Sequence, residues 1–317
     1  MYMRLQTIEL IEKKKNYTIK SKVNLIVNKN KVKLNFFCLN PQLIGIKYDI
    51  LSLETFTIEL KNPVKEKMIL IYSVDIDLTP HNKNWRNNIH QTYKEKNKSI
   101  LSLEQNMKKM NKNISYNFYN DKEVLQFLET YTDDYIIDFY NTIQQFPLKI
   151  DFWRLIVLYI FGGWYLDIDI SCLEPFNKIV DDKVEFLCPI TSETNSMFNA
   201  VLYSKPQSSI LMDCILMFLS LDMKNIVWKT GAFQSCFHML YAIKKEIQST
   251  DSQKNIPHIL QQGIYNDGKV KILSEVCCGD SVYDYYVLDF GKKVFKSRID
   301  NYDWITHKFI DNDKLVN

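Results

Sequence analysis

The chain has 317 residues, of which 46% are hydrophobic, enough to bury a sizeable core in one large or two modest domains. Its 40 Lys and Arg residues nearly balance 37 Asp and Glu residues, and the net charge of +3 does not indicate a nucleic-acid partner. No apolar run approaches the roughly 18 residues of a transmembrane segment, and the N-terminus lacks the continuous apolar core of a signal peptide. We therefore expect a globular cytoplasmic protein, for which peripheral membrane association stays open.

Residues 1–80 are predicted to form a β-rich N-terminal domain. Short segments of alternating polarity are separated by Lys and Asn patches, which favours a small antiparallel sheet or sandwich. The predicted strands cover residues 5–9, 23–27, 32–36, 44–50, 55–60 and 68–74. Binding of a ligand, a partner or a second subunit, and a purely stabilising role, all stay open for this domain.

Residues 81–317 are predicted to form a second domain in which strands and helices alternate. We predict strands at 89–93, 114–118, 184–190 and 198–203, and helices at 99–110, 121–130, 133–143, 207–221 and 230–245, the last capped by Thr230. This alternation predicts an α/β fold with a largely parallel sheet, in which ligands bind at the carboxyl ends of strands. His90 and Gln91 lie near the end of the first of these strands.

Residues 147–170 are predicted to form a helix, a two-glycine turn and a short strand. Pro147 suits the first turn of the helix, and Gly162–Gly163 end it. The helix is apolar nearly all round, as in a buried helix, yet Asp151 and Arg154 share one face of it. Because a buried charge must be paired or used, these two residues either form a plain ion pair or point at a polar ligand.

The strand after the glycines carries two acidic residues. Residues 164–169 alternate in polarity, so Asp167 and Asp169 are expected on one face of the strand, with Cα atoms about 7 Å apart. A divalent cation would relieve the repulsion between the two carboxylates, and oxygen ligands suit Mg²⁺ or Mn²⁺. Two ordinary surface acids are the alternative for this motif on its own.

The combined motif resembles the sugar-binding region of DXD glycosyltransferases, and most of all glycosyltransferase family 32. The resemblance rests on Asp151-x-x-Arg154, Leu158-Tyr159, Gly162-Gly163 and Tyr165-Leu166-Asp167-x-Asp169, and on the flanking segments Asn88-Ile89-His90-Gln91-Thr92-Tyr93, Phe198-Asn199-Ala200 and Ser204-Lys205-Pro206. Thr230-Gly231 resembles the family's Thr-Gly-Pro, but Ala232 replaces the proline. The resemblance covers roughly residues 85–235 and does not identify a substrate.

The resemblance implies a GT-A-like, Rossmann-type nucleotide-sugar-binding domain over residues 81–317. It also implies a hexosyltransferase that uses a UDP- or GDP-sugar, Mn²⁺ or Mg²⁺, and a glycan, lipid-linked or protein acceptor, with retention of anomeric configuration. The implied donor-binding residues are His90, Gln91, Asp151, Arg154, Gly163, Tyr165, Asp167 and Asn199. The implied catalytic residues are Asp167, Asp169 and Arg154, and the implied metal ligands are Asp169, Asp167 and His307.

Other histidines and acids have simpler interpretations. Family members often close the metal or diphosphate site with a C-terminal residue, which is why His307 is a candidate. For Trp304 two alternatives stay open, a place in the pocket wall or a packing role alone. We expect His238 to be a core or surface histidine. Asp75 and Asp77 repeat the Asp-Ile-Asp pattern without the two-glycine turn, so we interpret them as structural.

Two other classes of protein share these features. One is a catalytically inactive nucleotide-sugar or glycan-binding protein, which the alanine at position 232 favours. The other is a metal-dependent phosphohydrolase, although this class usually needs more clustered carboxylate or histidine ligands. Seven cysteines, odd in number and without Cys-x-x-Cys spacing, are expected to be mostly buried, reduced thiols.

Overall fold

The computed structural model of the chain describes residues 85–299 except 133, 192–193, 195, 220, 222–227, 251–259 and 282–283, together with residues 302–303 and 308–309. It also describes the backbone of six strands between residues 2 and 74. By its contacts the chain divides into two compact units, one with residues 1–80 and 125–142 and the other with residues 81–124 and 143–317.

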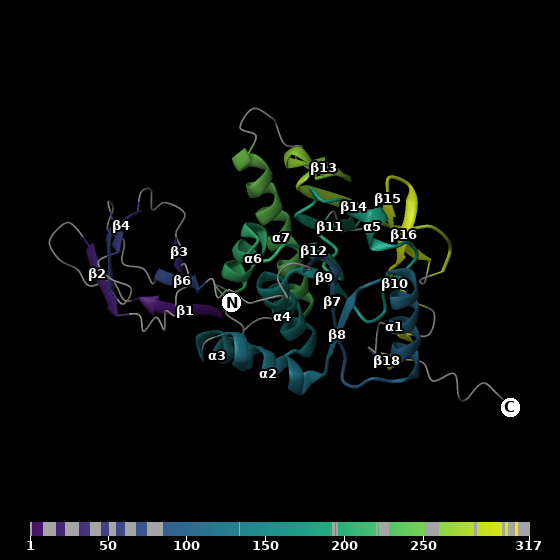
Figure 1. Cartoon of the computed structure of the whole chain (residues 1–317), viewed down its shortest axis with the longest axis horizontal. Coiled ribbons are helices and arrows are strands. Elements are labelled where there is room, and N and C mark those ends of the chain that lie inside the picture. The colour runs from purple at the N-terminus through teal and green to yellow at the C-terminus, as the bar shows by residue number, and fades with distance from the viewer. Residues whose placement is uncertain are drawn as a thin grey trace. The chain divides into compact units, whose positions relative to one another are not determined.

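The N-terminal unit contains two three-stranded antiparallel sheets (Figure 1). One has the order β1–β6–β3 and the other β2–β5–β4. The strands are β1 (Tyr2–Ile8), β2 (Tyr17–Lys22), β3 (Val32–Cys38), β4 (Ile46–Ile50), β5 (Thr55–Leu60) and β6 (Met68–Val74). The predicted β-rich character is confirmed, whereas the strand predicted at 23–27 lies outside the described residues. Helix α3 (Asp134–Thr142) and most of α2 (Asp121–Tyr131) belong to the same unit.

The second unit is built on a ten-stranded mixed sheet. Its strands are β7 (Asn88–Thr92), β8 (Ser115–Tyr119), β9 (Gly163–Leu166), β10 (Ser171–Cys172), β11 (Phe186–Thr191), β12 (Val201–Ser204), β13 (Gly263–Tyr265), β14 (Val270–Cys277), β15 (Tyr285–Asp289) and β16 (Lys292–Lys296). The order is β10–β16–β15–β14–β11–β12–β9–β7–β8, with β13 beside β14. A two-stranded ladder of β17 (Tyr302–Asp303) and β18 (Lys308–Phe309) follows.

The α/β class is confirmed, but the prediction of a largely parallel sheet is wrong. Only β7–β8, β7–β9 and β11–β14 pair in parallel among the described strands. The segment between β11 and β12, residues 192–200, has nine residues and is too short for the helical crossover that a parallel pair needs. Short connections without a helix likewise make β14, β15 and β16 an antiparallel meander.

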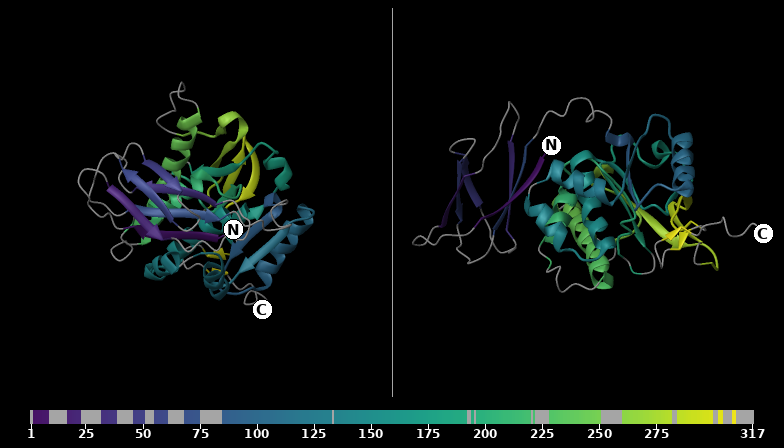
Figure 2. Two further views of the ribbon diagram at one scale, coloured as in Figure 1. Left: turned by 60° about the vertical axis from the view of Figure 1, so that its left-hand side comes forward. Right: turned by 90° about the horizontal axis from the view of Figure 1, so that it is seen from below.

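Helices cover both faces of this sheet, as Figures 1 and 2 show. One layer holds α4 (Phe146–Phe161), α6 (Ser209–Leu219) and α7 (Trp228–Thr250), and the other holds α1 (Lys98–Met110) and α5 (Phe176–Ile179). On the side of α1 and α5, Trp164 of β9 stacks on Phe176 with ring centroids 4.5 Å apart and lies 4.8 Å from Tyr203 of β12. This aromatic cluster fixes β9, the strand that leads into the acidic motif.

Helix α4 is the central buried element, and the helix predicted from Pro147 is confirmed. Every residue from Ile150 to Ile160 is buried, and the helix ends at the cap residue Gly162. The predicted start of the last long helix is wrong, because α7 begins at Trp228 and Thr230 therefore lies inside its first turn. No helix in the described part of the chain is long and apolar enough to cross a membrane.

The described cysteines are consistent with the expected reduced thiols. Cys172, Cys188 and Cys214 are buried and free, and Cys277 and Cys278 are free and exposed. The adjacent pair therefore forms no bridge.

The two glycines after α4 are required by space as well as by conformation. Gly162 has φ +65°, and a Cβ atom there would lie 2.5 Å from Cδ of Pro206. Gly163 has φ +96°, and a Cβ atom there would collide with the carbonyl oxygen of Asn88. The turn thus allows close approach of β7 and of Pro206, which explains why these segments accompany the two glycines in the sequence motif.

We predict that Gly163→Ala lowers the free energy of unfolding far more than Gly291→Ala. Both positions have positive φ, but a Cβ atom at Gly291 meets nothing within 4 Å. The change at Gly291 should cost about 1 kcal/mol from backbone strain alone, and the change at Gly163 about 3 kcal/mol or more. Denaturant unfolding of both variants measures the difference, and equal losses would contradict the close packing of the turn.

Candidate active site

The carboxyl ends of six strands meet at one edge of the sheet. The pairings make β7, β8, β9, β11, β14 and β16 run in the same direction. A cavity of about 360 Å³ lies at this edge. It is lined by Thr92, Tyr93, Phe146, Pro147, Ile150, Asp151, Arg154, Tyr165, Asp167, Ile168, Asp169, Phe198, Asn199, Ala200, Cys236, Ser297, Arg298 and Tyr302. The sequence-predicted residues Asp151, Arg154, Tyr165, Asp167, Asp169 and Asn199 therefore share one cavity.

The acidic motif lies in a turn and not in a strand, which corrects the predicted strand over residues 164–169. Strand β9 ends at Leu166, and the amide of Ile170 donates to the carbonyl of Asp167 at 3.0 Å. Ile168 is buried against Ile299 and Tyr302, so the chain leaves the sheet to bury this side chain. Asp167 and Asp169 flank it, and both still line the cavity.

Arg154 joins the helix to the acidic turn. Its Nη2 lies 3.1 Å from Oδ1 of Asp151 and 3.1 Å from Oδ1 of Asp167. Its Nη1 donates to the carbonyl of Asn199 at 2.7 Å, and the hydroxyl of Tyr165 donates to the same Oδ1 of Asp167 at 2.7 Å. Asp151 and Arg154 therefore form the ion pair of the first alternative. They also line the cavity, and contact with a polar ligand stays a prediction.

Asp151 has further partners from two other segments. Its Oδ1 accepts from Nδ2 of Asn199 at 3.1 Å, and its Oδ2 accepts from the hydroxyl of Ser235 on α7 at 3.4 Å. Burial raises the pKa of Asp151, which the charge of Arg154 opposes. Burial lowers the pKa of Arg154, but the charges of Asp167 and Asp151 help to outweigh it, and the pKa is raised overall. Arg154 is therefore permanently charged.

Asp169 differs from its neighbour, because no side chain in the described residues donates a hydrogen bond to its carboxylate. Burial, and then the charge of Asp167, raise the pKa of Asp169 to about 7. Asp167 uses only Oδ1 in its hydrogen bonds to described residues. Two repelling carboxylates at a cavity fit a divalent cation. The described residues contain no group of three His, Cys, Asp or Glu placed to hold a metal, so the other ligands would be phosphate oxygens and water.

His90 and Gln91 lie behind the turn and do not line the cavity. The His90 Nε2 donates to the carbonyl of Gly162 at 3.1 Å, and burial lowers the pKa of His90 to about 4, so it is neutral at pH 7. Gln91 donates to the carbonyl of Asp167 at 3.1 Å. These residues hold the two-glycine turn and the acidic turn in place. The next two residues of the chain, Thr92 and Tyr93, line the cavity.

The C-terminal wall could not be read from the sequence. His307 and Trp304 lie outside the described residues, and the side chain of Ala232 is not described. Ser297, Arg298 and Tyr302 line the cavity at the end of β16, and no motif marks them. Ser235 was likewise missed, because a single serine within a helical pattern carries no signal. His238 is half-buried in α7 and does not line the cavity, as expected of a structural histidine.

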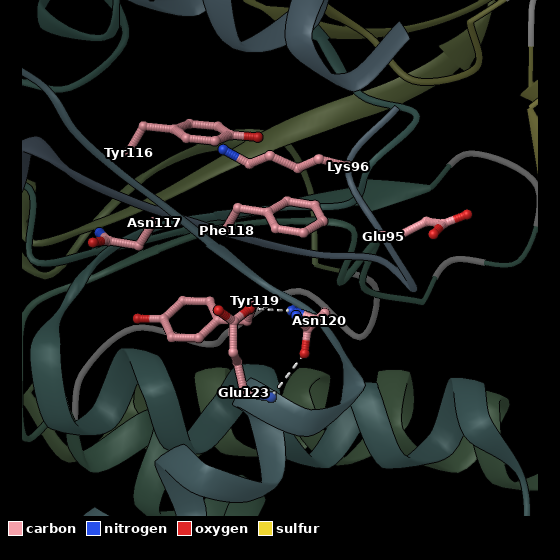
Figure 3. A pocket seen from close by; sticks show the side chains of 8 residues that line it. All are labelled: Glu95, Lys96, Tyr116, Asn117, Phe118, Tyr119, Asn120 and Glu123. Atoms are coloured by element: carbon pink, nitrogen blue, oxygen red, sulfur yellow. Dashed lines mark hydrogen bonds between the residues drawn. The ribbon is translucent and has the colours of Figure 1, made fainter. Parts of the chain in front are cut away.

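A second hollow, of about 560 Å³, lies along β8, and its lining is shown in Figure 3. Several of its polar lining residues form hydrogen bonds with the local backbone. Asn120 Oδ1 accepts from the amides of Lys122 and Glu123 at the start of α2, and Glu123 Oε2 accepts from the amide of Asn120 at 2.8 Å. These bonds form a capping box at the start of α2. The Lys96 ammonium lies 5.3 Å from the centre of the Phe118 ring. The positions of these side chains are therefore explained by contacts within the chain, without a ligand.

Comparison with known proteins identifies the region. Residues 81–185 match the profile of the family described as "Glycosyltransferase sugar-binding region containing DXD motif". This part of the chain is a DXD-motif glycosyltransferase region. It is about a third of the chain and contains β7, α4, β9 and the acidic turn. The resemblance to DXD glycosyltransferases is thus confirmed, while the narrower resemblance to family 32 stays a prediction.

Two solved structures show weaker likeness. "PaToxG Glycosyltransferase" is 16% identical over 53% of this chain and 71% of its own, with a TM-score of 0.40. "Structure of Transferase" is 10% identical over 58% of this chain and 94% of its own, with a TM-score of 0.32. No curated protein matches the chain.

We predict that Arg154→Met lowers the free energy of unfolding by about 3–5 kcal/mol. The change leaves Asp151 buried and without its counter-charge. Lys108→Met breaks an exposed pair with Glu104 and is the control, with an expected cost below about 1 kcal/mol. Urea unfolding measures both. Adding Asp151→Asn to Arg154→Met should recover part of the loss, and a loss no larger than that of the control would contradict the assignment.

We also predict that Asp169→Asn stabilises the metal-free protein at pH 8. The pKa of Asp169 in the folded state is about 7, above its ordinary value of 3.8, so between these pH values the folded state holds a proton that the unfolded state has released. This contribution to stability is present at low pH and is lost as the pH rises to about 7. After allowance for partial exposure, we expect a gain of about 1–2 kcal/mol.

The test is urea unfolding in EDTA at pH 4 to 8, with Asp182→Asn, an exposed acid, as control. The difference in unfolding free energy between Asp169→Asn and the unmodified chain should grow with pH over this range. A difference that does not change with pH would show that the folded-state pKa of Asp169 is not raised.

Proposed function

We propose that the protein transfers a hexose from a nucleotide-diphosphate sugar to a glycan, lipid or protein acceptor, with a divalent cation and with retention of configuration. The observation that carries the proposal is the acidic turn at the cavity. There Asp167 is held by Arg154 and Tyr165, whereas no side chain among the described residues donates a hydrogen bond to the carboxylate of Asp169. The family match over residues 81–185 supports the transferase class.

In this proposal, Asp169 binds the metal directly and Asp167 binds it through water or holds ribose and sugar hydroxyls. The cation would supply Lewis-acid stabilisation of the charge that develops on the departing diphosphate. Arg154 fixes the carboxylate of Asp167, since both Arg154 and Tyr165 bond to Oδ1 and so leave Oδ2 for the ligand. Preorganised oxygens of this kind need no rearrangement when the donor enters.

The donor sugar is proposed to lie against Asp151, Arg154 and Asn199. These residues line the cavity beside the acidic turn and offer both hydrogen-bond acceptors and donors to hydroxyl groups. His90, Gln91 and Gly163 act on the donor indirectly in this proposal, through the backbone of the two turns.

The transfer step exchanges one bond at the anomeric carbon. The acceptor hydroxyl oxygen bonds to this carbon while the bond to the diphosphate oxygen breaks, and the bonding electrons leave with the diphosphate. The acceptor proton passes to the departing diphosphate oxygen on the same face of the sugar. None of the acids that line the cavity is assigned as a nucleophile, because Asp151 and Asp167 are held by Arg154 and Asp169 is assigned to the metal.

Incubation with UDP-, GDP- and CMP-sugars and Mn²⁺ tests the proposal. We expect one donor to release nucleotide, and Asp169→Asn to lower this turnover by several orders of magnitude while thermal unfolding shows a folded protein. Binding of a donor without release of nucleotide would instead support an inactive nucleotide-sugar-binding protein. An inverted anomeric centre in the product would contradict retention.

A further inference from the structure

The part of helix α4 that lines the cavity changes from apolar to polar along the helix. It contributes Phe146, Pro147, Ile150, Asp151 and Arg154 to the lining. Spacings of three and four residues place these side chains on one face of the helix. Asp151 and Arg154 form the ion pair described above. The three residues nearer the start of the helix are apolar, so one stretch of the cavity wall offers contact area without a polar side chain.

This apolar stretch lies at the rim of the cavity. From Arg154 to the cap residue Gly162 the helix advances about 12 Å. The two-glycine turn reverses the chain, which then returns about 13 Å from Gly163 to Asp167. These matching lengths bring Arg154 level with Asp167, in agreement with their ion pair at 3.1 Å. Pro147 precedes Arg154 by seven residues and therefore lies about 10 Å beyond the acidic turn.

The rim is partly open to solvent. The Phe146 side chain is among the exposed large hydrophobic residues, with 37% of its surface accessible, whereas Ile150 is buried. Phe198, which precedes β12, is half-buried and also lines the cavity. An apolar side chain left accessible at the mouth of a ligand cavity gains free energy when a ligand covers it.

The position of the rim indicates which substrate would cover it. In the proposed function the donor sugar lies against Asp151 and Arg154, and Ile150 and Pro147 are within one helical turn of Asp151. An acceptor must lie beside the sugar for its hydroxyl group to reach the anomeric carbon. A glycan or a polypeptide at the rim would lose water from polar groups that these side chains cannot replace, whereas an alkyl group needs no hydrogen bonds.

We propose that the acceptor is a lipid, whose alkyl group lies against Phe146, Pro147 and Ile150. The inference rests on the proposed function and reduces its three classes of acceptor to one. The reacting hydroxyl group is at the polar end of the α4 wall, beside Asp151, and the alkyl chain leads away from it over Phe146.

Paired soluble acceptors test this class of substrate. Methyl and octyl glycosides of glucose, galactose and mannose are compared with the donor that releases nucleotide, in Mn²⁺ and below the concentration at which the octyl compounds form micelles. Each methylene group that becomes buried should raise kcat/KM about fourfold, so we expect an octyl-to-methyl ratio of at least about 10 for an accepted sugar. Methyl maltoside, which adds a second sugar and no alkyl chain, should show no such gain.

Replacement of Phe146 tests the place of the alkyl group. Phe146→Ala should lower the octyl-to-methyl ratio at least about fivefold, and Phe146→Leu should keep most of it, because leucine retains an apolar side chain. Phe237→Ala is the matched control. Phe237 is a phenylalanine of helix α7 that is 48% exposed and does not line the cavity, so its replacement should leave the ratio unchanged.

The outcomes separate this inference from the proposed function. Equal use of octyl and methyl glycosides, a preference for the maltoside, or donor hydrolysis without transfer to any octyl glycoside overturns the lipid acceptor and leaves the proposed function standing. Calorimetry with UDP and GDP in Mn²⁺ gives a further check. If Phe146→Ala weakens nucleotide binding, Phe146 contacts the base and the inference is overturned. If no donor releases nucleotide, the proposed function is overturned, and the inference with it.

Discussion

The guanidinium of Arg154 joins helix α4 to the acidic turn through two ion pairs. Arg154 is buried in a helix that is apolar on every side, and it bonds to an acid of its own helix and to the first acid of the turn. Because a lone buried charge is so costly, the helix and the turn stabilise each other only in this arrangement. The buried ion pairs of Arg154 thus fix the position of the acidic turn. Because this turn forms part of the cavity wall, the wall is held in place as well.

The second level of support comes from the backbone. Gln91 holds the carbonyl of Asp167, and His90 holds that of Gly162, so the neighbouring strand fixes both turns from behind. The glycines admit this close approach because they lack a Cβ atom. Residues that resemble ligand contacts in a sequence motif can therefore serve a ligand by positioning other groups, without touching it.

The sequence was informative where local rules decide the structure. Helix α4, its end at Gly162 and strand β7 follow from periodicity and from glycine, and Asp151 and Arg154 could be paired by their spacing. The turn at Asp167 could not be predicted, because it depends on burial of Ile168 against Ile299 and Tyr302, far along the chain. Arg298 and Ser235 could not be identified as site residues from the sequence for the same reason, because only tertiary packing brings them to the site.

The mixed sheet has a consequence for ligand binding. Thr92 is the last residue of the first strand of the unit and Arg298 follows β16, so the two walls are about 200 positions apart in sequence and come together only after long-range pairing is complete. A molecule that bridges these walls links the beginning of the unit to its end. Its binding energy therefore resists opening of the entire sheet, and a filled cavity protects amides in distant strands from solvent exchange as well as those beside it.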